Sequence, residues 1–376
     1  MKKILHITNW YPNKWNDIEA IFIKEQFDLF SEVTDSTLLH VEVRYCKNNW
    51  FKYEKVKHSD KETGFYIHTR IKIFRIIEVF TYFLLKKALK ESQYDNYDLI
   101  HFHIAYPLLT YYHKLKKLLK KPIILSEHWS AFHYNFYMPK TTKKLDRIKN
   151  IFRQKISLIT VSKALLNDIE EFSGTSSFPS IVISNVIDYS VYKFKQQSSV
   201  VHKKPTFFIV NFWREIKNPM PMLNAFAQLK ENGIDFELKI GGYGDYLEVI
   251  KQRVEKLELD NHVILLGKMN KQQIAQQMQN SSAYLFSSKY ETFSAVCAQA
   301  LCCGCPLIGP PLSAILEYAG IQEMINLETD DKEGWVKALK LFIEKQESFN
   351  RQDISKKVIN YLSHEKIQQQ YLAFLP

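Results

Sequence analysis

The chain has 376 residues, 46% of them hydrophobic, which is enough for two domains with buried cores. Its net charge of +11 fits a nucleic acid, an anionic membrane or an anionic substrate, but general solubility explains it as well, and charge alone does not choose among them. We find no apolar run long enough to span a bilayer and no signal-peptide pattern, so the expected location is cytoplasmic. The cluster Cys302, Cys303 and Cys305 lacks a metal-ligand spacing and a nearby histidine, and it is interpreted as core.

In the first half of the chain, strand-type runs alternate with helical patterns, which predicts an α/β architecture with parallel sheets. Helices are expected at 21–29, 82–90 and 108–119, the last two with a basic face. Strands are expected at 4–8, 37–43, 66–73, 99–103, 123–126, 158–161 and 181–184.

The pattern breaks over 189–205, which has the composition of an interdomain linker. The predicted domains are therefore 1–186 and 187–359, and the helical tail 360–376 either ends the second domain or packs back on the first. Two such halves form a cleft, where ligands commonly bind. Strands of the second half are expected at 207–210, 236–240, 263–266, 284–286 and 307–308.

The most informative stretch is 283–308, which predicts a strand, a helix over 293–303 ended by Gly304, and a second strand. Glu291, Thr292, Phe293 and Ser294 separate the first strand from the helix. In open α/β sheets, ligands bind at the carboxyl ends of strands, and a helix start suits a phosphate. This stretch therefore predicts a nucleotide-sugar site.

A second loop of this kind follows the strand at 207–210. It carries Arg214 and Lys217 ahead of a helix expected to have Asn218 as its N-cap and Pro219 as its first residue. Two cations there can neutralise a leaving diphosphate. The alternative is that both are ordinary solvated loop cations.

Three weaker signals lie nearby. Gly242 and Gly244 allow close approach of backbone to a ligand, although a tight turn explains them nearly as well. Backbone at Lys268 and Met269 could pair with a base edge. Gln299 follows Glu291 by eight residues, about two helical turns or roughly 12 Å, so the two could contact separate ends of one ligand.

In the first half, His128 follows the strand at 123–126 and could bind a substrate hydroxyl or phosphate; a structural histidine is the alternative. His101 and His103 are weaker candidates. The aromatic run 129–138 could hold an acceptor sugar, touch lipid, or pack on its own domain.

These motifs, taken in order, resemble the retaining GT-B glycosyltransferases of the "glycosyl transferases group 1" family, which are family 4-like. The segments that carry the resemblance are 211–218, 241–245, 263–268 and 288–308 in the second half, and 3–12, 21–26, 126–130 and 183–188 in the first. The resemblance covers nearly the whole chain and implies two Rossmann-like domains that face each other across a cleft.

The resemblance also implies roles for individual residues. Arg214 and Lys217 would hold the diphosphate, Glu291 would contact the donor sugar, and His128 would lie beside that sugar. Gln299 would contact the ribose, and Thr292, Phe293 and Ser294 would present N–H groups to the distal phosphate. The remaining expected donor-binding residues are Asn211, Gly242, Gly244, Lys268 and Met269. No metal and no cofactor are implied; the substrate would be a UDP- or GDP-sugar.

Two positions depart from the family pattern. Gln299 replaces the second Glu of the family signature and loses a charge-assisted bond to ribose. In the first loop, Ala20 stands where the family often has glycine, and Glu19 places a negative charge near the expected phosphate.

We therefore predict a metal-independent, retaining transferase that moves a sugar from a nucleotide diphosphate to a glycan, with a lipid-linked acceptor in surface polysaccharide biosynthesis. Its basic, aromatic first half predicts peripheral contact with an anionic membrane on the inner face. The alternatives are a degenerate relative that binds glycan or stabilises a complex, and a nucleotide-sugar epimerase or glycan phosphorylase on the same fold. No nucleic-acid partner is expected.

Overall fold

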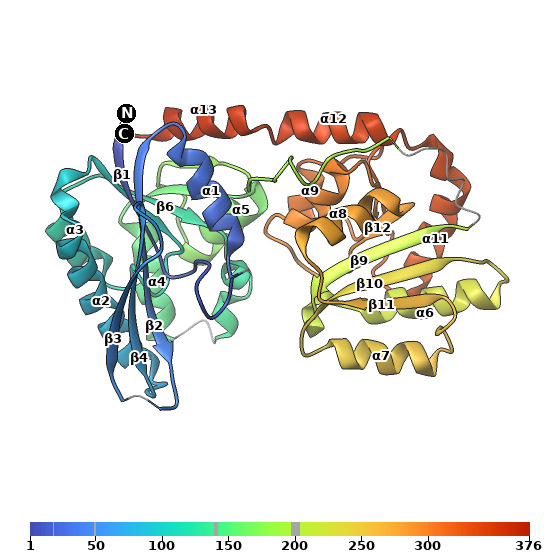
Figure 1. Ribbon diagram of the computed structural model, residues 1–376, viewed down its shortest axis with the longest axis horizontal. Helices are drawn as coiled ribbons and strands as arrows, with labels where there is room; N and C mark the ends of the chain where they lie inside the picture. The colour runs from blue at the N-terminus through green and yellow to red at the C-terminus, as the bar shows by residue number, and fades with distance from the viewer. Residues whose placement is uncertain (18, 49, 139–141, 197–203) are drawn as a thin grey trace. The chain divides into compact units, whose positions relative to one another are not determined.

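The computed structural model describes residues 1–17, 19–48, 50–138, 142–196 and 204–376. These residues form two compact units, shown in Figure 1. Unit 1 comprises Met1–Val186 and His364–Pro376, and unit 2 comprises Ile187–Ser363. The C-terminal helix is therefore part of unit 1. The predicted linker lies partly outside the described residues, because 197–203 are among those not described.

Unit 1 is built on an eight-stranded sheet of the described residues, in the order β3-β4-β2-β1-β5-β6-β7-β8. Apart from the antiparallel pair β3 and β4, neighbouring strands are parallel. The strands are β1 Lys3–Thr8, β2 Asp35–Tyr45, β3 Lys52–Lys57, β4 Glu62–Thr69, β5 Leu99–His103, β6 Ile123–Glu127, β7 Ser157–Thr160 and β8 Ser180–Val182. The helices are α1 Ile21–Ser31, α2 Phe74–Glu91, α3 Tyr112–Leu119, α4 Lys143–Arg153, α5 Lys163–Ser173 and α13 His364–Phe374.

The core of unit 1 explains why the distant C-terminal helix packs here. Ile367 and Tyr371 of α13 are buried in the same apolar cluster as Phe30 of α1 and Ile4 of β1. The Tyr371 ring stacks on Phe30 with 3.6 Å between centroids, and its hydroxyl bonds His101 Nδ1 at 2.9 Å. The amphipathic tail thus covers one face of the sheet.

The sequence placed three elements of unit 1 incorrectly. The strand expected at 66–73 is β4, which ends at Thr69, and α2 begins at Phe74, eight residues earlier than expected. The helix expected from 108 begins at Tyr112. The antiparallel strand β3 was not predicted; it is a charged edge strand without an apolar core pattern.

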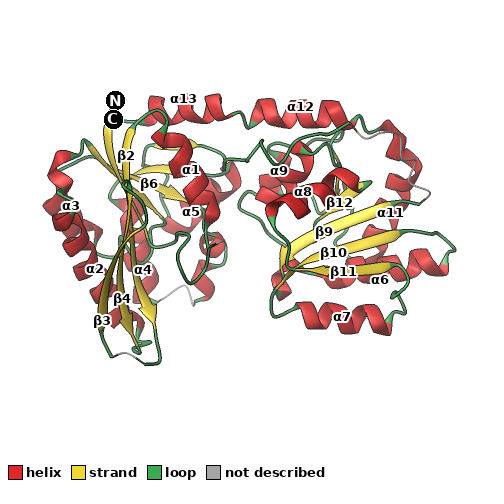
Figure 2. Cartoon of the chain, in the orientation of Figure 1, coloured by secondary structure: helices red, strands yellow, loops and turns green. Residues whose placement is uncertain are grey.

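Unit 2 contains a six-stranded parallel sheet of the described residues, in the order β11-β10-β9-β12-β13-β14. Helices cover both faces (Figures 1 and 2), and α6, α7 and α11 contribute to one large apolar cluster. The strands are β9 Thr206–Phe212, β10 Glu237–Tyr243, β11 Val263–Gly267, β12 Ala283–Leu285, β13 Leu307–Gly309 and β14 Met324–Asn326. The helices are α6 Pro219–Glu231, α7 Leu247–Lys256, α8 Lys271–Asn280, α9 Ala295–Cys302, α10 Ser313–Leu316, α11 Lys332–Lys345 and α12 Arg351–Tyr361.

In unit 2 one predicted helix start was wrong, the N-cap position of Asn218 was confirmed without the expected side-chain bond, and one strand was not predicted. The helix expected from 293 begins at Ala295, because Ser294 adopts a left-handed backbone with φ of 61°. Asn218 precedes α6 as expected, but it is left-handed and its side chain makes no cap bond, bonding Asp330 instead. The edge strand β14 was missed. Among the described residues, no helix has both the length and the apolar character needed to cross a bilayer.

Candidate functional site

The central contact of unit 2 joins two loops that are far apart in sequence. Lys217, in the loop between β9 and α6, pairs with Glu291, in the loop between β12 and α9, at 2.6 Å between Nζ and Oε1. Ser287 Oγ also donates to the Lys217 carbonyl, and Lys289 N donates to Ile216 O. Because parallel strands end at one edge, both loops lie at the carboxyl edge of the sheet, where an α/β sheet binds ligands.

A second group of side chains lies at the same edge, beyond β9, β10 and β11. The Arg214 guanidinium lies over the Phe212 ring at 4.6 Å, and the Phe212 ring contacts Tyr243. Lys268 Nζ lies 5.4 Å from the centre of the Tyr243 ring. Phe212 and Tyr243 are both exposed, so two cations and two rings form an open surface at the strand ends. Such a surface attracts an anionic, planar ligand.

The glycines beside this surface are required by geometry. Gly242 has a φ of 106°, and a Cβ there would collide with the Asn211 carbonyl oxygen; Gly244 has a φ of 134°, and a Cβ would collide with Trp213. Trp213 is fully buried, and its Nε1 donates to Gly241 O at 2.8 Å. Gly242 lies within β10, which continues to Tyr243, whereas Gly244 lies in the turn that follows the strand.

The sulfur of Met269 also packs against this segment. A Cβ on Gly241 would come within 2.6 Å of Met269 Sδ. Asn211, Gly242, Gly244, Lys268 and Met269 are therefore neighbours in the fold, at the ends of β9, β10 and β11.

The loop before α9 is held from behind by a residue that sequence reasoning missed. The buried hydroxyl of Tyr318 donates to Phe293 O at 2.8 Å and contacts Ser294 O at 3.1 Å, and its ring packs on Phe293. Thr292 and Ser294 are fixed by this backbone rather than by a side-chain cap. A lone tyrosine some 25 residues away carries no sequence signal for this role.

The predicted two-turn spacing between Glu291 and Gln299 was wrong. Glu291 lies in the loop outside α9, so only Gln299 of the two is helical, and the helical rise does not measure their separation. Gln299 is partly exposed on α9.

In unit 1, His128 follows β6 and is 6% exposed. Desolvation lowers its pKa to about 3, so the ring is neutral. His128 Nδ1 lies 3.2 Å from Asn185 Oδ1, which only accepts, so Nδ1 carries the proton. Nε2 is then an acceptor, and it has no hydrogen-bond partner among the described residues. A hydrogen-bond donor such as a sugar hydroxyl could bind to His128 Nε2.

Glu127 and Asn185 hold His128 in place, and neither was among the predicted site residues. Glu127 is fully buried, and its two carboxylate oxygens accept from Ala105 N at 3.1 Å and His128 N at 3.3 Å. Burial raises the pKa of Glu127 to about 8 despite these two bonds. Its position directly before His128 was the available sequence signal.

Three histidines of unit 1 form a buried cluster whose ring nitrogens lie within 4.8 Å of one another: His6, His101 and His103. His6 Nδ1 bonds His103 Nε2 at 3.0 Å, and His6 Nε2 bonds Ser36. His101 bonds Ser126 and Tyr371. Burial lowers the pKa of all three. Hydroxyl groups partner three of the six ring nitrogens, the bond between His6 and His103 joins two more, and His103 Nδ1 has no hydrogen-bond partner among the described residues. This donor set is therefore a hydrogen-bonded network of the core.

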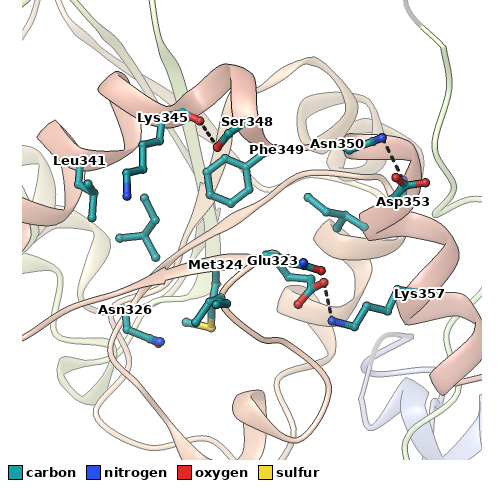
Figure 3. A pocket seen from close by; sticks show the side chains of 14 residues that line it. Glu323, Met324, Asn326, Leu341, Lys345, Ser348, Phe349, Asn350, Asp353 and Lys357 are labelled. Atoms are coloured by element: carbon teal, nitrogen blue, oxygen red, sulfur yellow. Dashed lines mark hydrogen bonds and ion pairs between the residues drawn. The ribbon is translucent and has the colours of Figure 1, made fainter.

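A cavity of about 660 Å³ lies elsewhere in unit 2, between β14, α11 and α12 (Figure 3). Its wall includes Glu323, which is buried and pairs with Lys357 at 2.7 Å. None of the predicted donor-binding residues lines it. The predicted donor-binding residues instead lie at the ends of β9, β10 and β11, in the loop before α9, and on α9 itself in the case of Gln299.

Two protein-family models match the chain on either side of the boundary between the units. "Glycosyl transferases group 1" matches residues 191–361, and "Glycosyltransferase Family 4" matches residues 52–191. Together they span most of the chain. Glycosyltransferase models thus match residues of both units, 52–361 together. The resemblance read from its motifs is thereby confirmed, and so is the expected pair of Rossmann-like domains.

Curated relatives align with this chain over part of their length. N-acetyl-alpha-D-glucosaminyl L-malate synthase of Bacillus anthracis is 24% identical over 243 residues, 62% of each chain. A Campylobacter jejuni transferase, N-acetylgalactosamine-N,N'-diacetylbacillosaminyl-diphospho-undecaprenol 4-alpha-N-acetylgalactosaminyltransferase, is 26% identical over 185 residues, 49% of each chain. The chain thus aligns with about half to three fifths of the length of these relatives.

Solved structures match the chain over nearly its full length. Sucrose-phosphate synthase from Thermosynechococcus elongatus superposes with a TM-score of 0.77 at 14% identity, covering 99% of this chain and 98% of that one. The Anabaena protein HepE in complex with UDP-glucose superposes with a TM-score of 0.73 at 16% identity, covering 100% of both chains. These likenesses establish the GT-B fold.

The two departures from the family pattern have different structural settings. Ala20 adopts a left-handed backbone with φ of 46° directly before α1, a conformation that favours glycine. Glu19 is held by Asn13, whose Nδ2 donates to Glu19 Oε2 at 2.9 Å. Ile18, between Asp17 and Glu19, lies outside the described residues.

Proposed function

We propose that this protein transfers a sugar from a nucleotide diphosphate donor to a glycan acceptor, with retention of anomeric configuration and without a metal. The observation that carries the proposal is the Lys217–Glu291 pair, which sets a cation and a carboxylate side by side at the carboxyl edge of the unit 2 sheet. HepE, with the same fold, was solved with UDP-glucose. A glycosyl diphosphate needs both groups, one for its phosphates and one for its sugar hydroxyls.

The chemistry follows from the charges. When the bond between the sugar C1 and the phosphate oxygen breaks, negative charge develops on the diphosphate, and Arg214 and Lys217 would stabilise it. These two cations supply the charge that a divalent metal supplies elsewhere, which supports metal independence. The acceptor hydroxyl forms the new bond to C1, and its proton passes to the departing phosphate oxygen. Retention is inferred from the family resemblance.

Glu291 and His128 would recognise the sugar. The Glu291 carboxylate accepts hydrogen bonds from sugar hydroxyls, which are strengthened by its charge. His128 Nε2, as a neutral acceptor, would take one further hydroxyl. Gln299 would contact the ribose, and backbone N–H groups at Thr292, Phe293 and Ser294 would contact the distal phosphate.

The acceptor and location are also proposed. The Campylobacter jejuni relative is named for a diphospho-undecaprenol glycan, which supports a lipid-linked acceptor here. A role in surface polysaccharide biosynthesis at the inner face of the membrane, with peripheral membrane contact, follows from such an acceptor.

The direct test measures release of UDP or GDP from a panel of nucleotide sugars, with and without lipid-linked and soluble glycan acceptors. Lys217→Ala should reduce release by at least about 100-fold, because charge stabilisation of a leaving group contributes about 3 kcal/mol or more. The matched control is Lys251→Ala, at an exposed position of α7, and its nucleotide release should equal that of the wild type. Activity should persist in EDTA, and proton NMR should show a product with the donor's anomeric configuration.

The same experiment separates the alternatives. A degenerate relative would release no nucleotide with any donor–acceptor pair while remaining folded, and calorimetry would show no loss of UDP or GDP binding in Lys217→Ala. An epimerase would convert the donor sugar without an acceptor. Either result would overturn the proposal.

A further inference from the structure

Two loops of unit 1 expose apolar side chains at one place on its surface. Trp50 and Phe51 precede β3, and Ile73 and Phe74 begin α2; each of these four is 59–66% exposed. Tyr45, at the end of β2, is exposed beside them. Side chains so exposed protrude into solvent, and a cluster of them costs free energy unless something covers it.

Contacts between the loops show that these side chains form one surface. Tyr45 and Thr69 are register partners at the ends of β2 and β4, and Thr69 Oγ1 donates to Trp50 O at 2.8 Å. The Phe51 ring packs edge-on against Phe80 of α2, with 5.8 Å between centroids. We define the strand-end patch as Tyr45, Trp50, Phe51, Ile73 and Phe74 together with the cations Arg70, Lys72 and Arg75.

The charges of the patch are all of one sign. The Arg70 guanidinium lies over the Trp50 ring, and Lys72 Nζ lies 4.3 Å from the centre of the Tyr45 ring. In the sequence, residues 43–53 and 63–77 contain no Asp or Glu, although they carry six Lys or Arg. Aromatic side chains at loop tips with surrounding cations suit the interface of a bilayer with anionic lipid, where the rings enter the headgroup layer and the cations meet phosphates.

The patch lies at the same edge of the sheet as His128. β2, β4, β5 and β6 run parallel to one another, so their carboxyl ends share an edge. Lys144 Nζ lies 4.1 Å from the Phe74 ring and 4.4 Å from the Tyr106 ring. Tyr106 follows Ala105, whose N–H bonds Glu127 beside His128. A continuous run of contacts thus leads from the patch to His128.

We propose that the strand-end patch docks unit 1 on an anionic lipid bilayer and so delivers a membrane-held acceptor to the edge that carries His128. This inference rests on the proposed function, because it names the surface that makes the peripheral membrane contact proposed there; only the delivery of the acceptor also requires the transferase activity. Each patch cation near an anionic surface contributes about a fivefold gain in membrane partitioning.

The test is cosedimentation of the full chain with vesicles of phosphatidylcholine alone or with about 30 mol% phosphatidylglycerol, an anionic content that gives a strong negative surface potential. The chain should bind the anionic vesicles only, and binding should weaken as NaCl rises from about 0.1 to 0.5 M because salt screens surface charge. Lys72→Glu with Arg75→Glu should reduce partitioning by at least about 25-fold, from two cations at fivefold each. Trp50→Ser with Phe51→Ser should reduce it while leaving the preference for anionic vesicles.

The controls match each change elsewhere in the chain. Lys251→Glu with Lys356→Glu alters net charge equally in unit 2, and Ile321→Ser with Tyr361→Ser removes two exposed apolar side chains there. Patch variants that bind like these controls would overturn the proposal. So would equal binding to neutral vesicles, binding to a short single-stranded oligonucleotide in place of vesicles, or concentration-dependent dimerisation that the Trp50 variant abolishes.

Donor hydrolysis in solution distinguishes the two proposals. If vesicle binding fails while nucleotide release from a donor with a soluble acceptor is intact, the docking surface is wrong and the transferase function stands. If the chain binds vesicles through the patch but releases no nucleotide from any donor, the docking stands without the proposed activity.

Discussion

The Lys217–Glu291 pair predicts an unusual effect of a single substitution. The two side chains are only 21% and 18% exposed and their charged atoms lie 2.6 Å apart, so a diphosphate must compete with Glu291 for Lys217. Glu291→Gln keeps the size and a hydrogen-bonding oxygen but removes the competing charge. A charged hydrogen bond contributes about 1.5–3 kcal/mol, which partial exposure reduces to about 1–2 kcal/mol. UDP or GDP should therefore bind Glu291→Gln about 5- to 30-fold more tightly.

Sugar transfer should change in the opposite direction. The amide of Glu291→Gln cannot make charge-assisted bonds to sugar hydroxyls, and loss of one such group in an active site commonly costs about 100-fold or more in rate. Calorimetry of UDP and GDP with the wild type, Glu291→Gln, Lys217→Ala and the double variant measures the binding side. In the double variant the gain should vanish, since Glu291 then has no Lys217 to hold. Glu255→Gln, exposed on α7, is the control. If Glu291→Gln weakens nucleotide binding as much as Lys217→Ala does, Glu291 does not compete for Lys217 and the reasoning is refuted.

Two further predictions concern the supporting residues. Burial raises the pKa of Glu127 from its ordinary 4.5 to about 8, so the folded chain keeps a proton that the unfolded chain loses. The contribution of Glu127 to the free energy of unfolding should thus be greatest below pH 4.5 and fall as pH rises to about 8, by up to about 1.4 kcal/mol per pH unit. Glu127→Gln should remove this dependence when stability is measured by urea unfolding. If the variant and the wild type showed the same slope, Glu127 would be ionised in the folded chain. Gly242→Ala should lower stability by roughly 1–3 kcal/mol and abolish nucleotide binding, because a Cβ at φ of 106° would collide with the Asn211 carbonyl oxygen. The control is Gly233→Ala, where nothing obstructs a Cβ; it should lower stability only through its φ of 75° and leave nucleotide binding intact. Tight nucleotide binding by Gly242→Ala would contradict this account.

Local patterns predicted most of the sheet, because a parallel strand is buried on both faces and reads as a continuous apolar run. β9 shows this with residues 206–210, all buried. The same rule explains why β3 was missed: it is an antiparallel edge strand with alternating charges, so nothing in its composition indicates burial. In β14 only Met324 and Ile325 are apolar, between the polar residues Glu323 and Asn326, so no continuous apolar run marks this strand.

The candidate site was predictable in residue types but not in contacts. Polar residues after strands indicated Arg214, Lys217 and Glu291, since strand ends share an edge. Their pairing could not be read from the sequence, because Lys217 and Glu291 are 74 residues apart and meet through the order of β9 and β12. The left-handed Asn218 and Ser294 likewise depend on tertiary contacts that override cap preference.

Gln299 gives the strongest reason to ask whether the chain is degenerate, and its setting argues for a simple test. Other residues hold the loop before α9: Tyr318 bonds Phe293 and Ser294, and Ser287 bonds Lys217. A change at Gln299 should therefore leave the scaffold intact. Gln299→Glu would restore the charge of the family signature on a partly exposed position, where a charge costs little. One charge-assisted bond to ribose should raise UDP or GDP affinity by about 1 kcal/mol, or about fivefold.

The control for this change is Gln276→Glu, which adds the same charge to exposed α8 of the same unit. A gain in UDP or GDP affinity confined to Gln299→Glu means that the nucleotide site is formed and that Gln299 weakens only one of its contacts. The wild-type chain would then be an active enzyme with reduced nucleotide affinity. If Gln299→Glu and Gln276→Glu have equal affinity for UDP or GDP, and the wild type binds neither nucleotide, Gln299 does not face a ribose. That result would favour the degenerate alternative over the transferase.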